Sequence, residues 1–211
     1  MKVAILTNGS YGNYEFCNDI CTNDYIICAD NGIKHAKLLG ITPNILIGDF
    51  DSANQEDFNY FVHQKNIEVV KLPSEKDETD TELALQYAIE HGATNITIYG
   101  GLGHRFDHSL ANVHLLYQAL TAKVECCLKN EFNTIYLINK EICISGKIGQ
   151  LISLLPFTEN VLGVYTKGLA YSLENGQFTL GKPYGISNYM TENLAQIKID
   201  SGLLLVMKTK D

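Results

Sequence analysis

Ile45-Leu46-Ile47-Gly48-Asp49-Phe50-Asp51-Ser52 joins an apolar run, with the pattern of a buried strand, to a glycine and two acidic residues. An extended backbone through Asp49 and Asp51 would direct both carboxylates to one face, with their Cα atoms about 7 Å apart. Oxygen ligands without a neighbouring His or Cys suit Mg²⁺, or Mn²⁺, better than Zn²⁺. The stretch therefore predicts a strand that ends in a metal site, and Mg²⁺ bound in this way commonly serves phosphate chemistry.

Similar apolar runs alternate with helical patterns through the first part of the chain. The runs that we expect to form strands are residues 3–6, 25–28, 45–47, 67–70, 96–99 and 124–128. Between them, apolar residues recur at helical spacing around Leu83 and again from Leu110 to Leu120. This alternation predicts an α/β domain with a mainly parallel sheet flanked by helices, whose ligands bind at the carboxyl ends of the strands.

The sequence changes character after about Leu128. Short apolar runs separated by turn residues follow, at residues 134–138, 142–144, 151–155, 161–165, 169–173, 177–180 and 203–207. Asn175-Gly176 between two of these runs predicts a hairpin with a type I′ turn. Because no helical pattern remains, we expect an all-β, sandwich-like domain over residues 136–211, after an α/β domain over residues 1–135.

Composition and charge exclude several classes of protein. Of the 211 residues, 45% are apolar and 19% are charged, as in compact globular proteins. The formal net charge of -8 argues against nucleic-acid binding, which requires a basic stripe. The apolar run after the first residues is too short for a signal peptide or a membrane span, so we expect a cytoplasmic protein without membrane contact. The 6 cysteines form no C-x-x-C pair and are expected to be reduced thiols.

A second acidic segment, Lys76-Asp77-Glu78-Thr79-Asp80, precedes an apolar helical run. Thr79 and Glu82 have the spacing of a capping box, in which each side chain accepts a hydrogen bond from the backbone of the other residue. Asp77 and Asp80 are then either ordinary acids at a helix start, favoured there by the helix dipole, or part of the metal site. The expected arrival of both acidic segments at one edge of the sheet favours the metal site.

A glycine-rich segment, Gly100-Gly101-Leu102-Gly103-His104-Arg105-Phe106-Asp107-His108, joins a predicted strand to a predicted helix. Such a turn into a helix N-terminus can bind phosphate. Phe106 occupies the third glycine position of the dinucleotide fingerprint, which argues against a nicotinamide cofactor. Arg105 would face the phosphate, unless the segment is only a tight turn with a surface arginine. His104 and His108 lack a third zinc ligand and are expected to be structural or to support other residues of the site.

Together, four motifs in this order closely resemble the thiamine pyrophosphokinases of bacterial type: G-D-F-D-S at 48–52, K-D-E-T-D at 76–80, G-G-x-G-x-R-x-D-H at 100–108 and G-x-S-N at 185–188. The resemblance covers essentially the whole chain. It implies an enzyme that transfers the pyrophosphoryl group of Mg-ATP to the hydroxyl group of thiamine, giving thiamine diphosphate and AMP. It also implies that the first domain is catalytic, that the second binds thiamine, and that the active site lies at the subunit interface of a homodimer.

The resemblance further implies roles for single residues. The implied metal ligands are Asp49, Asp51 and Asp80. The implied catalytic residues are Asp77, Asp80 and Arg105. Contacts to ATP are implied for Asp30, Ser52, Lys76, Thr79, Arg105 and Asp107. Contacts to thiamine are implied for Asp80, Ser187 and Asn188. The chain departs from the family pattern in having Asn31 where relatives often have glycine, and in having no Trp to stack on the substrate ring.

Two other functions account for part of the pattern. An Asp-x-Asp motif after an apolar strand is also the nucleophile motif of haloacid-dehalogenase-like phosphatases. In those enzymes the motif normally follows the first strand, whereas Asp49 follows the third predicted strand, and the β-domain is left unexplained. A non-catalytic sensor of nucleotide or thiamine is the second alternative. The intact acidic residues and Arg105 argue against it.

Overall fold

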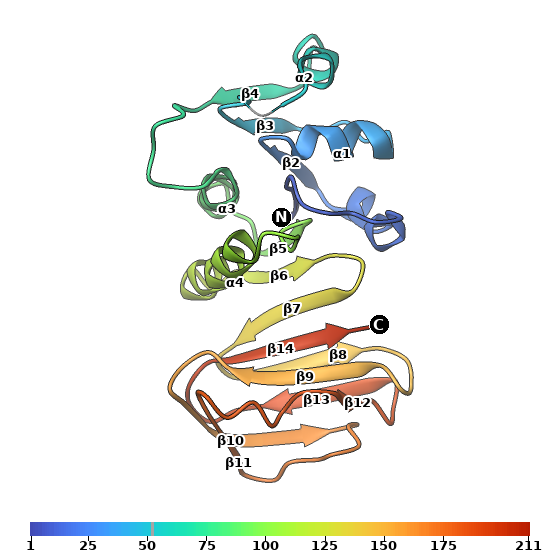
Figure 1. Ribbon diagram of the computed structural model, residues 1–211, viewed down its shortest axis with the longest axis vertical. Coiled ribbons are helices and arrows are strands. Elements are labelled where there is room, and N and C mark those ends of the chain that lie inside the picture. Colours follow the sequence, from blue (N-terminus) through green and yellow to red (C-terminus); the bar gives the residue numbers. More distant parts are fainter. Residues whose placement is uncertain (52) are drawn as a thin grey trace. The chain divides into compact units, whose positions relative to one another are not determined.

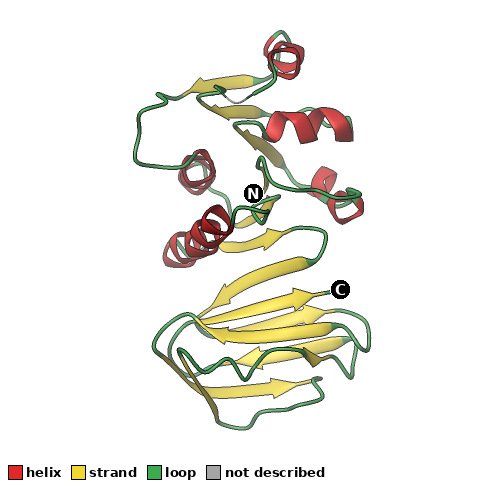
Figure 2. Ribbon diagram, in the orientation of Figure 1, coloured by secondary structure: helices red, strands yellow, loops and turns green. Residues whose placement is uncertain are grey.

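The computed structural model describes residues 1–51 and 53–211 and divides the chain into two compact units, Met1–Glu131 and Phe132–Asp211. In the first unit strands alternate with helices, whereas the described elements of the second unit are all strands (Figures 1 and 2). None of the described helices has the length and apolar character needed to cross a membrane. The predicted fold class, an α/β part followed by an all-β part, is confirmed.

The first unit is built on a parallel sheet. Its strands are β1 (Lys2–Leu6), β2 (Tyr25–Ala29), β3 (Ile45–Gly48), β4 (Glu68–Lys71), β5 (Asn95–Tyr99) and β6 (Glu125–Lys129), in the spatial order β6-β5-β1-β2-β3-β4. Each pairing between these neighbouring strands is parallel. Because β1 lies between β2 and β5, the strand order reverses there. In open parallel sheets a reversal of this kind opens a crevice for ligands at the carboxyl ends of the strands.

Helices cover both faces of this sheet. The described α-helices are α1 (Gly32–Leu39), α2 (Gln55–Val62), α3 (Asp80–Glu90) and α4 (Phe106–Thr121), and two short 3-10 turns, η1 (Glu15–Cys17) and η2 (Ile20–Thr22), precede β2. On one face, Ile33 of α1 and Phe61 of α2 pack in a core with Leu6 and Cys28 of the strands. Helices α3 and α4 lie on the opposite side (Figure 1). Side chains are buried on both faces, which explains the continuous apolar runs of the strands.

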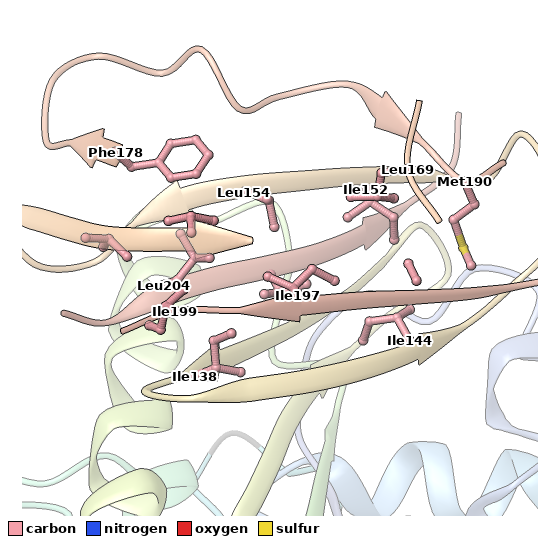
Figure 3. Close-up of a cluster of buried hydrophobic side chains, with 14 residues drawn as sticks. Ile138, Ile144, Ile152, Leu154, Leu169, Phe178, Met190, Ile197, Ile199 and Leu204 are labelled. Carbon is pink, nitrogen blue, oxygen red and sulfur yellow. The ribbon is translucent and has the colours of Figure 1, made fainter. Parts of the chain in front are cut away.

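The second unit contains two antiparallel sheets. Their strands are β7 (Asn133–Ile138), β8 (Glu141–Ser145), β9 (Leu151–Pro156), β10 (Asn160–Lys167), β11 (Gly176–Thr179), β12 (Asn188–Tyr189), β13 (Leu194–Lys198) and β14 (Leu204–Thr209). One sheet has the order β12-β9-β14-β7 and the other β11-β10-β13-β8. Figure 3 shows the apolar core between them, to which Ile152 and Leu204 contribute from one sheet and Ile144 and Ile197 from the other. All six cysteines of the chain are free thiols, as expected.

Two local predictions for the second unit are wrong. Residues 169–173 do not form a strand, because Leu169 makes only an isolated bridge to Met190. Strand β11 pairs instead with β10. The hairpin with a type I′ turn is also absent, since Asn175 has a φ of 57° but Gly176 is not among the residues with positive φ. Strands β12 and β13 were not predicted.

Candidate functional site

Three carboxylates gather where two neighbouring strands of the first unit end. Asp30 follows β2, and Asp49 and Asp51 follow β3. One oxygen of each residue lies within 4.8 Å of the other two, and we call these residues the carboxylate cluster. Three oxygens at such separations can bind one cation, and carboxylates are preferred ligands of Mg²⁺ and Mn²⁺. By the chemistry of its donors, the cluster fits a divalent cation.

A tight turn, not an extended backbone, brings two of these carboxylates together. Strand β3 ends before Asp49, and Phe50 has a φ of 58°, so the predicted extended conformation is wrong. The N–H of Asp51 donates to Asp49 Oδ1 at 3.1 Å, and this bond lowers the pKa of Asp49. Ser52, which was predicted to contact ATP, lies outside the described residues.

The backbone of Asp30 holds the third carboxylate beside β3. Its N–H donates to the carbonyl of Ile47 at 2.8 Å, and its φ is 45°. A Cβ on Gly48 would lie 2.9 Å from the Cα of Asp30, so a glycine lets the two strand ends approach this closely. From the sequence, we predicted that Asp30 contacts ATP and did not include it among the metal ligands. Its position directly after the apolar run of β2 was the signal that could have placed it in the cluster.

Lys76 connects the carboxylate cluster to the second acidic segment. Its Nζ lies 3.1 Å from Asp80 Oδ1 and 3.9 Å from Asp49 Oδ2. Burial raises the pKa of Asp80, Lys76 opposes that effect, and the charges of Asp30 and Asp49 reinforce it. Asp80 therefore adjoins the cluster without being one of its three members. Asp77 is exposed and, within the described part of the chain, belongs neither to the cluster nor to the cleft described below.

Half of the predicted capping box is present at the start of α3. Thr79 is the N-cap residue, and its Oγ1 accepts a hydrogen bond from the N–H of Glu82 at 3.1 Å. The reciprocal bond is replaced, because Glu82 Oε1 accepts from Gln118 Nε2 of α4 at 2.7 Å. Glu82 thus ties α3 to α4. Asp80 lies in the first turn of α3. The N-cap bond of Thr79 stabilises this turn, and the bond between Glu82 and Gln118 attaches it to α4.

A cleft of about 550 Å³ opens at the carboxyl ends of β1, β2 and β5, where the strand order reverses. Its volume is in the range of small-molecule sites. Its walls include the loop 7–10 after β1 and the glycine-rich loop 100–105 after β5. Asp30 and Asp80 also line it, so the cleft and the carboxylate cluster share Asp30.

The two loops of the cleft are in backbone contact. A Cβ on Gly9 would lie 1.7 Å from the carbonyl oxygen of Gly100. Gly100 itself has a φ of 73°, and a Cβ there would lie 2.2 Å from the ring of Tyr11. The sequence did not predict a role for the loop 7–10. The signal that could have indicated it was Gly9, which follows Thr7 and Asn8 after the first predicted strand.

Most residues of the third motif line the cleft. Arg105 precedes α4, and its side chain is 71% exposed and donates to both carboxylate oxygens of Asp107, at 3.2 and 2.5 Å. This pairing lowers the pKa of Asp107 to about 2. His104 and His108 line the cleft too, but neither belongs to a metal-binding group of the described residues.

The fourth motif lies in the second unit, and its two polar residues differ in what they can do. Ser187 is exposed and has a φ of 58°. Asn188 is buried, and its Oδ1 accepts from the N–H of Tyr171 at 3.0 Å while its Nδ2 donates to the carbonyl of Tyr171 at 2.9 Å. These bonds occupy the polar atoms of Asn188. The Asn188 amide therefore holds the segment at Tyr171, whereas Ser187 is exposed to solvent.

Family models match both parts of the chain. The model described as "Thiamin pyrophosphokinase, catalytic domain" matches residues 18–128. The model described as "Thiamin pyrophosphokinase, vitamin B1 binding domain" matches residues 139–204. The first match contains the carboxylate cluster and most of the cleft, and the second contains Ser187 and Asn188.

Individual relatives agree with these matches. The chain is 30% identical over 197 residues to the thiamine pyrophosphokinase of Bacillus subtilis. The aligned region covers 88% of this chain and 87% of that protein. A crystal structure of thiamine pyrophosphokinase from the same organism superimposes with a TM-score of 0.89 at 27% identity, with complete coverage (100%) of both chains. A thiamin pyrophosphokinase family protein from Enterococcus faecalis gives a TM-score of 0.85, also at 27% identity and with 100% coverage of both chains.

Proposed function

Since the chain belongs to the thiamine pyrophosphokinase family, we propose that it transfers the pyrophosphoryl group of Mg-ATP to the hydroxyl group of thiamine. Members of this family are pyrophosphotransferases, so the chain is an enzyme of that class. The products of the proposed reaction are thiamine diphosphate and AMP.

One observation carries the proposal: Asp30 belongs both to the carboxylate cluster and to the lining of the cleft. A nucleotide in the cleft would have its phosphates against the loops 7–10 and 100–105, next to the three carboxylates. A site that must bind a polyphosphate next to acidic groups requires a cation between them. The pairing of an acidic cluster with a glycine-lined cleft therefore favours a metal-dependent reaction of a nucleotide.

The glycine-rich loop and the start of α4 supply groups that suit phosphate. Helix α4 spans 16 residues, and its first N–H groups and the positive end of its dipole lie directly after the loop 100–105. Arg105 remains charged at any relevant pH and can leave Asp107 to bind phosphate oxygens with its planar fork. Together these groups would orient the triphosphate and stabilise negative charge on the group in transfer.

Asp30, Asp49 and Asp51 would hold Mg²⁺, with Mn²⁺ as an alternative. When bound, the metal would supply positive charge that offsets the phosphates and polarises the transferred group. Lys76 contributes a further positive charge between Asp49 and Asp80.

Asp80 is the candidate for orienting the attacking hydroxyl group. Its pKa is raised by burial and by the neighbouring carboxylates, which makes it a stronger base than an ordinary aspartate. It also lines the cleft, next to Thr79 at the start of α3. In the proposed reaction Asp80 accepts a hydrogen bond from the thiamine hydroxyl group and takes its proton as the hydroxyl oxygen bonds to the β-phosphorus. The bond between that phosphorus and the α,β-bridging oxygen breaks, and the bridging oxygen leaves with AMP. Asp77 was predicted to be catalytic, but it is exposed, so in the proposed reaction it contributes only its negative charge near the site.

Ser187 and Asn188 are expected to respond differently to mutation. Ser187→Lys adds positive charge where the cationic thiazolium ring would bind, and should raise the KM for thiamine at least about tenfold without changing that for ATP. Asn188→Ala leaves the backbone of Tyr171 unpaired and should lower the free energy of unfolding by about 1–3 kcal/mol. Steady-state kinetics and thermal unfolding measure these effects.

The control for Ser187→Lys is Ser187→Gly, which fits the φ of 58° and adds no charge. Because it removes at most one hydrogen bond to thiamine, it should raise the KM for thiamine by less than about fivefold, well below the effect of the lysine. An unchanged KM for thiamine in Ser187→Lys would contradict the assignment of this residue to the thiamine site. Wild-type stability in Asn188→Ala would contradict the structural role of its amide.

We further propose a homodimer in which the second unit of one protomer supplies the thiamine contacts for the first unit of its partner. Tyr171, Tyr184 and Ile186 are more than half exposed, at 69%, 56% and 54%, and offer an apolar surface around Ser187. Asp49→Asn and Ser187→Lys should each be nearly inactive when thiamine is limiting. After subunit exchange, an equal mixture should recover about a quarter of wild-type activity, because half of the dimers then have one intact site. No recovery, in a mixture shown by mass spectrometry to contain mixed dimers, would rule out a shared site.

Product analysis tests the proposed function. Purified protein is incubated with thiamine, ATP and Mg²⁺, and the products are separated by anion exchange. We expect thiamine diphosphate and AMP in equal amounts, and neither product without the metal. Formation of thiamine monophosphate and ADP would contradict pyrophosphoryl transfer. Binding of both ligands without any product would instead favour a non-catalytic sensor.

A further inference from the structure

His35 is a buried histidine for which the proposed reaction has no role. It lies on α1 and is only 5% exposed. Burial lowers its pKa to about 4, an effect to which the charge of Lys34 adds. The ring is therefore neutral near pH 7, with a hydrogen on one nitrogen and a lone pair on the other. A buried neutral imidazole can thus donate one hydrogen bond and accept one.

The neighbours of the His35 ring indicate which of its nitrogens carries the hydrogen. Tyr14 Oη lies 2.8 Å from Nδ1 of His35. The ring also makes a hydrogen bond to the backbone of Gly9, and this bond raises the pKa of His35 as a carbonyl acceptor does. Because a carbonyl can only accept, the nitrogen that faces Gly9 carries the hydrogen. Since Nδ1 already faces Tyr14, we assign Nδ1 as the acceptor from the Tyr14 hydroxyl group and Nε2 as the donor to Gly9.

The ring of His35 also supports the second loop of the cleft. It stacks on the ring of Tyr11, with a centroid distance of 3.7 Å and an angle of 15° between the planes. Tyr11 packs under Gly100, and its hydroxyl group donates to the carbonyl of Tyr99 at 2.8 Å. His35 thus contacts Gly9 of the loop 7–10 directly, and it contacts the loop 100–105 indirectly, through Tyr11.

The start of α1 is placed so that His35 reaches these loops. A Cβ on Gly32 would lie 2.1 Å from the carbonyl oxygen of Leu6, so a glycine brings α1 against the end of β1. The loop 7–10 begins directly after Leu6. His35 follows about one helical turn after Gly32, on the side that faces this loop. The contact between His35 and Gly9 is thus a product of close packing between helix and strand.

We propose that His35 is a positioning residue for nucleotide binding, which fixes the loop 7–10 through a hydrogen bond to Gly9 and the loop 100–105 through its stack on Tyr11. This inference rests on the proposed function, because it assumes that the cleft binds the nucleotide. Loss of the bond to Gly9 leaves the cleft intact but less well ordered, so the binding of nucleotide weakens while the site for thiamine is unchanged.

The test compares two amides at position 35. In His35→Gln the side-chain amide nitrogen can take the place of Nε2 and donate to Gly9. In His35→Asn the shorter amide can replace Nδ1 at Tyr14 but does not reach Gly9. The probe is α,β-methylene-ATP with Mg²⁺, an analogue with no cleavable bond at the position of transfer, and its Kd is measured by isothermal titration calorimetry. We expect His35→Asn to raise this Kd about five- to tenfold and His35→Gln to stay within about twofold of the wild type.

Thermal unfolding and the KM for thiamine separate a positioning role from a merely structural one. Both variants lose the aromatic stack, so both should lose similar amounts of thermal stability and keep the wild-type KM for thiamine. Equal weakening of nucleotide binding in the two variants, or none in His35→Asn, would overturn the proposal. If neither variant folds, Tyr14→Phe tests the same hydrogen-bond chain with the imidazole retained. It should raise the Kd about threefold, and an unchanged Kd would count against the proposal.

The wild-type protein distinguishes this inference from the function on which it rests. If the wild type does not bind the analogue, the nucleotide site of the proposed function is wrong and the role of His35 is overturned with it. If the wild type binds the analogue and His35→Asn binds it equally well, the proposed function stands and only the inference about His35 fails.

Discussion

Asp49→Asn is expected to lower kcat by about two to three orders of magnitude while leaving the fold intact. The change keeps the volume of the side chain and removes one of three negative charges whose oxygens lie within 4.8 Å of each other. Asparagine Oδ1 can still accept the hydrogen bond from the N–H of Asp51, so the turn after β3 should persist. Asp51→Asn should behave in the same way. The measurements are kcat at fixed free Mg²⁺, the thermal midpoint, and Mn²⁺ affinity in the absence of nucleotide.

Glu78→Gln is the matched control for this prediction. It makes the same change of charge at an exposed position in the neighbouring acidic segment, outside the carboxylate cluster. Its turnover and its Mn²⁺ affinity should lie within about twofold of the wild type. Near-normal turnover and unchanged Mn²⁺ affinity in both aspartate variants would refute the assignment of these residues to the metal.

Gly9→Ala is the second change with a large expected effect. The new Cβ would lie 1.7 Å from the carbonyl oxygen of Gly100, so one of the two loops of the cleft has to move. The clash is with backbone, which cannot rotate away as a flexible side chain can. We expect binding of α,β-methylene-ATP to become undetectable and the thermal midpoint to fall by roughly 5 to 10 °C.

Gly103→Ala provides the comparison within the same site. A Cβ at Gly103 would have only ordinary contacts, 3.8 Å from the nitrogen of Ser10 and 3.9 Å from the Cα of Gly9. Its thermal midpoint and nucleotide affinity should therefore stay close to those of the wild type. If Gly9→Ala bound the analogue as well as Gly103→Ala does, the close approach of the two loops would not matter for the nucleotide.

The parallel sheet could be predicted from the sequence because its strands are buried on both faces. Runs such as Ile45-Leu46-Ile47 are continuously apolar, and each of the six predicted strands agrees with the structure to within one residue at either end. The antiparallel unit was harder to predict. Strand β13 buries only Ala195 and Ile197, and β12 has 2 residues, so neither gives a strong periodic signal. Conversely, Leu169 is buried without belonging to a strand.

The candidate site was only partly predictable, because its geometry depends on long-range contacts. Asp49 and Asp51 could be selected since they follow an unmistakable strand. Their approach to each other depends on the left-handed backbone conformation of Phe50. This conformation is uncommon for a phenylalanine, so the sequence does not predict it. The loop 7–10 carries no charged side chain, and its importance follows from contact with Gly100, about ninety residues later in the chain.

The fate of the β-phosphorus of ATP distinguishes pyrophosphoryl transfer from transfer of a single phosphoryl group. The protein is incubated with thiamine, Mg²⁺ and ATP that carries ³²P only at the β position, and the products are separated by thin-layer chromatography. Pyrophosphoryl transfer predicts that the label appears in thiamine diphosphate and that the nucleotide product is unlabelled AMP. Label retained in ADP, with unlabelled thiamine monophosphate beside it, would contradict the account.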